Sequence, residues 1–127
     1  MPPKRKTKFV YPIDKKEDFA KVVCEENSKL AVIDCHLGWC GPCEVIEQNY
    51  ATLWFNIEDP ENRIEFWSCE DKKMDEENLT NLQYGPLTCM PRFLLYRNGE
   101  KKAEISGADY TKLEEAIYKY LPQMEFE

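Results

Sequence analysis

The sequence has little that would support a histidine-rich metal site, a membrane anchor or export. His36 is the single histidine, and no apolar run reaches the roughly 20 residues that a membrane-spanning helix needs. Residues 1–8 are basic and lack the apolar core of a signal peptide. No internal repeat or long linker divides the sequence. We therefore expect a protein of the cytoplasm or nucleus that is not secreted and makes no membrane contact.

The charge balance narrows the range of partners. The chain has 24 acidic and 17 basic residues and a formal net charge of -7, which disfavours binding to nucleic acid or to anionic membranes. Its 127 residues, 43% of them apolar, are enough to fill the core of one domain. We expect a basic flexible leader over residues 1–8, a folded domain over 9–122 and a short acidic tail over 123–127.

Hydrophobic patterns predict strands and helices in alternation. Strands are expected at residues 9–13, 30–33, 64–69, 93–96 and 103–105, and helices at about 14–26, 40–56, 75–82 and 113–121. Pro12 cannot donate to a ladder, so the first strand should lie at an edge. Asn98-Gly99 is a strong signal for a type I′ hairpin, which makes the last two strands antiparallel. The order predicts a three-layer α/β/α domain around a mixed sheet.

Cys40 and Cys43 are the only two of the six cysteines whose spacing suggests a joint chemistry. A dithiol exchanger needs one thiolate to attack a disulfide and a second thiol to resolve the mixed disulfide. A helix that begins at Cys40 would stabilise its thiolate, which makes Cys40 the nucleophile and Cys43 the resolving thiol. A zinc site and an inert structural pair are the alternatives. Zinc would need a second pair of ligands, which the sequence does not offer, and we expect no metal and no cofactor.

Five segments occur in the order and approximate spacing of a known family: Val32-Ile33-Asp34, Trp39-Cys40-Gly41-Pro42-Cys43, Met90-Pro91, Asn98-Gly99-Glu100 and Gly107-Ala108. On these motifs the chain resembles the thioredoxin family over nearly its whole length after the leader. The resemblance implies the thioredoxin fold and a protein-disulfide oxidoreductase. It also implies protein disulfides as substrates and a flavin-dependent thioredoxin reductase as a partner.

The same resemblance assigns roles to individual residues. It implies that Asp34 is a buried aspartate with an elevated pKa that takes the proton of Cys43. An aspartate that bonds to a local turn is the alternative. Pro91 resembles the family's cis-proline, and Trp39, which could also be a packing aromatic, would flank the groove. The residues expected to form this substrate groove are Trp39, Gly41, Pro42, Met90, Pro91 and Arg92.

Three further positions bear on the site. Cys89 stands directly before Met90-Pro91, as in some animal thioredoxins, and could be a regulatory thiol that forms an intermolecular disulfide. A small residue that fills a loop is the alternative reading of Cys89. Arg92 occupies a position where the family usually has threonine, so we expect a cation at the groove. The strand over residues 64–69 lacks the lysine that often accompanies the family's buried aspartate.

The departures from a minimal thioredoxin point to a specialised role. The basic leader, the acidic loop at residues 58–62 and the surroundings of the cysteines resemble the thioredoxin-like light chains of outer-arm axonemal dynein. That resemblance implies dynein heavy or intermediate chains as partners and the ciliary axoneme as a location. The alternative is a free cytosolic or nuclear thioredoxin that acts as a general protein-disulfide reductase.

Overall fold

The computed structural model describes residues 8–40 and 46–123. The predicted basic leader, apart from Lys8, and all of the acidic tail except Gln123 lie outside these ranges. So do Gly41, Pro42 and Cys43.

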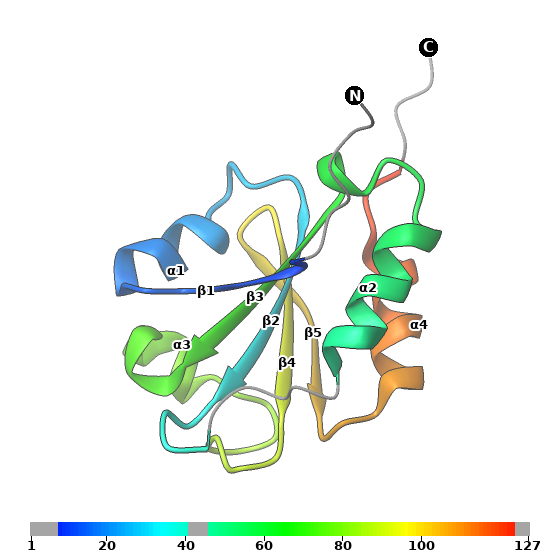
Figure 1. Cartoon of the computed structure of the whole chain (residues 1–127). Helices are drawn as coiled ribbons and strands as arrows, with labels where there is room; N and C mark the ends of the chain where they lie inside the picture. The colour runs from blue at the N-terminus through cyan, green and yellow to red at the C-terminus, as the bar shows by residue number, and fades with distance from the viewer. Residues whose placement is uncertain (1–7, 41–45, 124–127) are drawn as a thin grey trace.

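One mixed sheet runs through the centre of the molecule (Figure 1). Its strands lie in the order β1-β3-β2-β4-β5, and their bounds are Val10–Pro12, Ile64–Glu70, Leu30–His36, Arg92–Arg97 and Glu100–Ser106. The first three strands of that order are parallel, and β4 and β5 are antiparallel to their neighbours. The strand that carries Pro12 lies at the edge, as the missing N–H of proline predicts.

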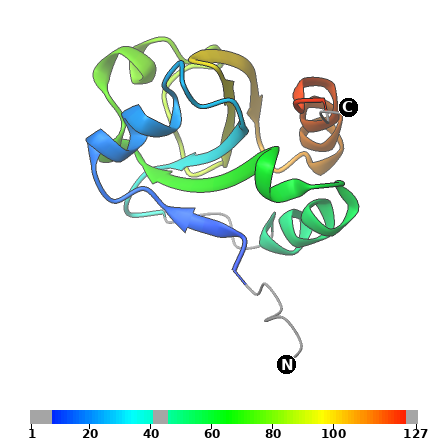
Figure 2. The ribbon, with the colours of Figure 1, turned by 90° about the horizontal axis from the view of Figure 1, so that it is seen from above.

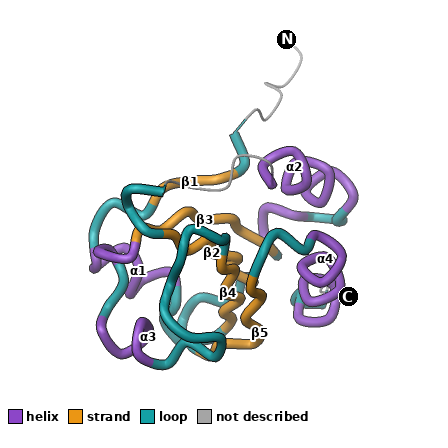
Figure 3. The backbone as a smooth tube through the Cα atoms, turned by 90° about the horizontal axis from the view of Figure 1, so that it is seen from below, coloured by secondary structure: helices purple, strands orange, loops and turns teal. Residues whose placement is uncertain are grey.

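Helices cover both faces of the sheet, so the predicted three-layer arrangement is confirmed. Helices α1 and α3 lie on one side and α2 and α4 on the other, as the views in Figures 2 and 3 also show. Their bounds are Lys16–Val22, Glu76–Thr80, Ile46–Asn56 and Tyr110–Tyr120. The order of elements along the chain matches the prediction, although α1 is shorter than expected. None of the helices in the described ranges is long and apolar enough to cross a membrane.

The hydrophobic core is divided by the sheet into two layers. Side chains of a strand point alternately to opposite faces, and β2 shows the result. Leu30 and Val32 belong to the core under α2 and α4, whereas Ala31 and Ile33 belong to the core under α1 and α3. A strand that is buried on both faces has a continuous apolar sequence. The apolar run at residues 30–33 predicts a central strand for this reason.

Two local features confirm the hairpin between β4 and β5. Asn98 and Gly99 have φ values of 53° and 80°, and a type I′ turn needs positive φ at both central residues. Asparagine and glycine tolerate this region better than other residues do. A register shift between Leu95 and Tyr96 interrupts the ladder beyond the turn, and it places Phe93 opposite Ile105 and Arg92 opposite Ser106.

The sheet topology also determines which loops, and therefore which reactive side chains, lie close together. Because β2 and β4 are antiparallel and Cys35 pairs with Arg92, the carboxyl end of β2 lies beside the amino end of β4. The loop that follows β2 and the loop that precedes β4 therefore meet at one edge of the sheet. These two loops carry Cys40 and Cys89.

Candidate active site

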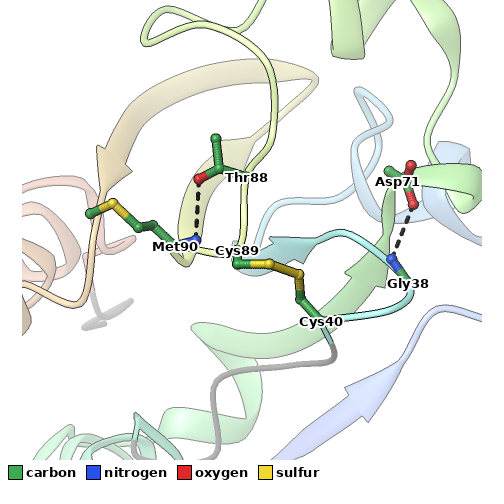
Figure 4. The surroundings of a disulfide bond; sticks show 6 residues. All are labelled: Gly38, Cys40, Asp71, Thr88, Cys89 and Met90. Carbon is green, nitrogen blue, oxygen red and sulfur yellow. Dashed lines mark hydrogen bonds between the residues drawn. A yellow bond between two sulfur atoms is a disulfide. The ribbon is translucent and has the colours of Figure 1, made fainter.

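The loop after β2 presents Cys40 beside an exposed aromatic ring. Trp39 is 81% exposed, and Cys40 is partly buried next to it. The N–H of Cys40 donates to the carbonyl of Leu37 at 3.0 Å, which closes a turn. The N–H of Gly38 donates to the Asp71 carboxylate at 3.3 Å, from the 3-10 turn Asp71–Lys73 (Figure 4). The backbone that leads to Cys40 is thus fixed at two points.

Cys40 is joined to Cys89 by an intrachain disulfide (Figure 4). The two residues are 49 positions apart in the sequence, and their Cα atoms lie 5.6 Å apart. Cys89 is exposed, so the bond lies at the surface of the molecule. The sequence alone allows two roles for Cys89, an intermolecular disulfide or a small loop residue. In the structure Cys89 is instead bonded to the expected nucleophile of its own chain.

Met90 and Pro91 lie beside this disulfide. The side chain of Met90 is 60% exposed, and its N–H donates to the hydroxyl of Thr88 at 3.1 Å. The carbonyl of Pro91 accepts from the N–H of Gly107 at 2.8 Å. The expectation of a cis peptide before Pro91 was wrong, because no peptide bond within the described ranges is cis. The trans form of an X–Pro bond is the more stable one and needs no tertiary support.

Arg92 requires a second correction, since its side chain does not present a cation to the groove. The residue is only 3% exposed, and one of its guanidinium nitrogens lies 3.1 Å from the Glu104 carboxylate. The guanidinium also donates to the carbonyls of Gly85 at 2.8 Å and Pro86 at 3.2 Å. A buried guanidinium needs partners for its donors. Gly85 and Pro86 belong to the loop that precedes Cys89, so Arg92 anchors that loop.

Glu104 completes this buried cluster. Its carboxylate accepts from the backbone N–H groups of Gln83 at 2.8 Å and Tyr84 at 3.1 Å, and from the ammonium of Lys101 at 2.8 Å. Burial opposes the charged form of Glu104, but these hydrogen bonds outweigh it, and the pKa of the carboxyl lies below its ordinary value. Sequence reasoning missed this group. Its only signal in the sequence was a glutamate between two apolar residues, Ala103 and Ile105, within the predicted strand.

Asp34 is a buried acidic residue in β2. It is 2% exposed on β2, and its neighbours in register are Ser68 on β3 and Phe93 on β4. Burial makes a carboxylate here costly, as the sequence suggested. The position facing it on β3 holds a serine, which agrees with the absence of the family's usual lysine.

The buried cysteines Cys35 and Cys69 can be set aside as nucleophiles. Burial raises the pKa of the Cys35 thiol well above its usual range, and the neighbouring Cys69 and Asp34 add to the effect. Burial, with Glu70 and Asp71, raises the pKa of Cys69 to about 12. Both therefore stay protonated at neutral pH, and the thiolate is the reactive form. His36 is buried as well, and the described part of the chain holds no group of side chains that could bind a metal.

Comparison with known proteins identifies the family of this chain. The family model for thioredoxin matches residues 10–119. Mouse thioredoxin is 33% identical over 111 residues, which cover 85% of this chain and 95% of the mouse protein. The chain belongs to the thioredoxin family. Thioredoxin-1 of Schizosaccharomyces pombe is similarly related, with 32% identity over 110 residues, 86% of this chain and 96% of the yeast protein.

Solved thioredoxin structures share the fold. The crystal structure of the reduced thioredoxin pre-protein of Schistosoma mansoni superposes with a TM-score of 0.64 at 26% identity. The match covers 89% of this chain and 99% of the other. Membership of the family makes this protein a thiol-disulfide oxidoreductase that acts on protein disulfides.

Proposed function

We propose that Cys40 is the attacking thiol of this oxidoreductase and that Cys43 resolves the mixed disulfide. The main support for this proposal is the position of Cys40 in the structure. It follows the carboxyl end of β2 at the surface, beside the exposed side chains of Trp39 and Met90. Cys35 and Cys69 are buried, and their raised pKa values keep them as thiols.

The reaction then has two steps. The Cys40 thiolate attacks one sulfur of a substrate disulfide, which forms a mixed disulfide and releases the other substrate sulfur as a thiolate. The Cys43 thiolate next attacks Cys40, which forms the Cys40–Cys43 disulfide and releases the second substrate thiol. Trp39 and Met90 offer apolar surface against which the substrate backbone can lie, and Asp34 takes the proton of Cys43.

Asp34→Asn tests the proposed proton acceptor. The amide should raise the free energy of unfolding by ~1 kcal/mol, because it removes a buried charge without changing the shape of the side chain. It should also slow resolution of the mixed disulfide several-fold. Chemical denaturation and rapid quenching measure the two effects. Asp14→Asn is the matched control, since Asp14 is exposed before α1 and should change neither quantity. An unchanged resolution rate in Asp34→Asn would remove Asp34 from the mechanism.

We further propose that the domain works as a redox-active light chain of outer-arm axonemal dynein. The resemblance in the leader and the acidic loop supports this role. That loop includes Glu58 and the 3-10 turn Pro60–Asn62 and follows α2, whose Phe55 is 60% exposed. An exposed aromatic beside acidic residues is suited to a partner with a basic rim around an apolar pocket. Dynein heavy or intermediate chains in the cilium are the partners that this role implies.

Fractionation of ciliated cells distinguishes a subunit from a free reductase. Most of the protein should sediment with outer-arm dynein and leave the axoneme with it at high salt, because contacts between surface charges weaken as salt rises. A cytosolic marker enzyme and an inner-arm component provide the controls. Recovery of nearly all the protein as a free 15.0 kDa species that a flavin-dependent reductase recycles would instead establish a general thioredoxin of the cytoplasm or nucleus.

A further inference from the structure

We propose that Cys89 is a second resolving thiol, so that the site has three working cysteines. The inference rests on the proposed attack by Cys40 and follows from the Cys40–Cys89 disulfide in the structure. A thiol that can bond to the nucleophile within one chain can also displace a substrate from it. Cys89 would then do what Cys43 is proposed to do, from the opposite loop.

The backbone is already set for this bond. Disulfides form when the Cα atoms lie roughly 4.4–6.8 Å apart, and those of Cys40 and Cys89 lie 5.6 Å apart. The positions of the two loops therefore accommodate this disulfide. Reactants held at bonding distance behave as if they were very concentrated, so attack by Cys89 should compete with any thiol in solution.

The buried ion cluster holds the loop of Cys89 in place. Arg92 binds the carbonyls of Gly85 and Pro86, and Glu104 binds the N–H groups of Gln83 and Tyr84. The side chain of Leu87, two residues before Cys89, is buried in the core under α1 and α3.

The backbone after Cys89 is fixed as well. The carbonyl of Pro91 accepts from the N–H of Gly107. On the other side of the disulfide, Asp71 and Leu37 fix the loop of Cys40. Each cysteine thus sits on a supported backbone, and the close approach of the two is a property of the fold.

No other cysteine outside residues 41–45 can take this role. Cys35 and Cys69 are buried. The Cys24 thiol donates to the carbonyl of Lys21 next to α1, and the turn there lies at the amino end of β2, away from Cys40. Among the cysteines that the structure describes, Cys89 combines exposure with the required distance to Cys40.

The step balances without any further reactant. Cys40 attacks the substrate disulfide, and one substrate sulfur leaves with the electron pair of the broken bond. Exposed Cys89 loses its proton to water, and its thiolate attacks the Cys40 sulfur. The Cys40–Cys89 bond forms, the bond from Cys40 to the substrate breaks, and the second substrate sulfur leaves and takes up a proton. The substrate disulfide has gained two electrons, and the two cysteines are oxidised.

The inference is tested by trapping with native insulin, whose disulfides are the substrate. The full chain is first reduced, and the reductant is then removed. Cys43→Ser should form a mixed disulfide only transiently and end with a Cys40–Cys89 bond that peptide mass spectrometry detects. Cys43→Ser/Cys89→Ser should hold the adduct at Cys40 at least ten times longer. Cys43→Ser/Cys24→Ser is the matched control, because it also removes a non-buried thiol, and it should resolve as fast as Cys43→Ser.

The possible outcomes separate this inference from the proposed function. Equally long-lived adducts in Cys43→Ser and Cys43→Ser/Cys89→Ser would overturn the role of Cys89 and leave attack by Cys40 intact. Absence of any Cys40 adduct in the folded double variant would overturn the proposed function itself. Thermal unfolding of each variant shows that it is folded, which the exposed position of Cys89 leads us to expect.

Discussion

Cys40→Ser is expected to lower the rate of protein-disulfide reduction by roughly 1,000-fold or more, the scale seen when a nucleophile is removed. The reason is chemical, since a serine hydroxyl stays protonated at neutral pH and does not displace sulfur. The insulin reduction assay, with dithiothreitol as electron donor, measures the rate.

Cys24→Ser is the control for this experiment. It removes a thiol of the same chain that lies away from Cys40, and the rate should stay within two-fold of the parent, or roughly 0.4 kcal/mol. A Cys40→Ser protein that keeps a tenth of the parental rate would show that another thiol, with Cys89 or Cys43 as candidates, starts the reaction.

Glu104→Leu is expected to lower the free energy of unfolding by about 3–5 kcal/mol, because it leaves the buried guanidinium of Arg92 without its carboxylate. The midpoint of thermal unfolding should fall by about 10–20 °C. The loop over residues 83–86 also loses the acceptor of two N–H groups. Arg92→Met/Glu104→Leu should recover much of the loss, since apolar residues often replace a buried ion pair at little cost.

The exposed pair Glu100–Lys102 supplies the matched control on the same strand. Glu100→Gln breaks an ion pair of 2.7 Å at the surface and should barely change the unfolding midpoint. If Glu104→Leu were as harmless as Glu100→Gln, the cluster would not be the anchor of the Cys89 loop.

Acidification should destabilise the protein by protonating the Glu104 carboxylate. The pKa of Glu104 lies below its ordinary value in the folded protein, so its stabilising effect is complete above the unfolded carboxyl pKa of about 4.3. That effect is lost as the pH falls through the folded pKa. The parent should therefore lose more stability on acidification than Glu104→Leu does.

Local signals explain why so much of the fold was predictable from the sequence. Asn98-Gly99 fixes a turn through the backbone freedom of its own two residues, and Pro12 restricts its strand to an edge. The continuous apolar run at residues 30–33 reports burial on both faces of the sheet. Each of these signals lies within a few residues of the feature that it predicts.

The site was harder to predict because its contacts join distant segments. Nothing near Arg92 in the sequence shows that its partners are Glu104 and the carbonyls of residues 84–86, so the sequence alone predicts a cation at the groove. The pairing of Cys40 with Cys89 depends on β2 and β4 being antiparallel neighbours. The spacing of Cys40 and Cys43 is enough to predict thiol-disulfide exchange. Which distant residues come into contact at the site depends on the topology of the sheet.

Site-resolved alkylation tests the central claim, that Cys40 is the attacking thiol, most directly. The fully reduced chain is treated with less than one equivalent of iodoacetamide, and peptide mass spectrometry assigns the label while insulin reduction is measured on the same sample. The account predicts that Cys40 is labelled first and that activity falls in proportion to its modification. Earlier labelling of another cysteine, or full activity in protein alkylated at Cys40, would contradict it.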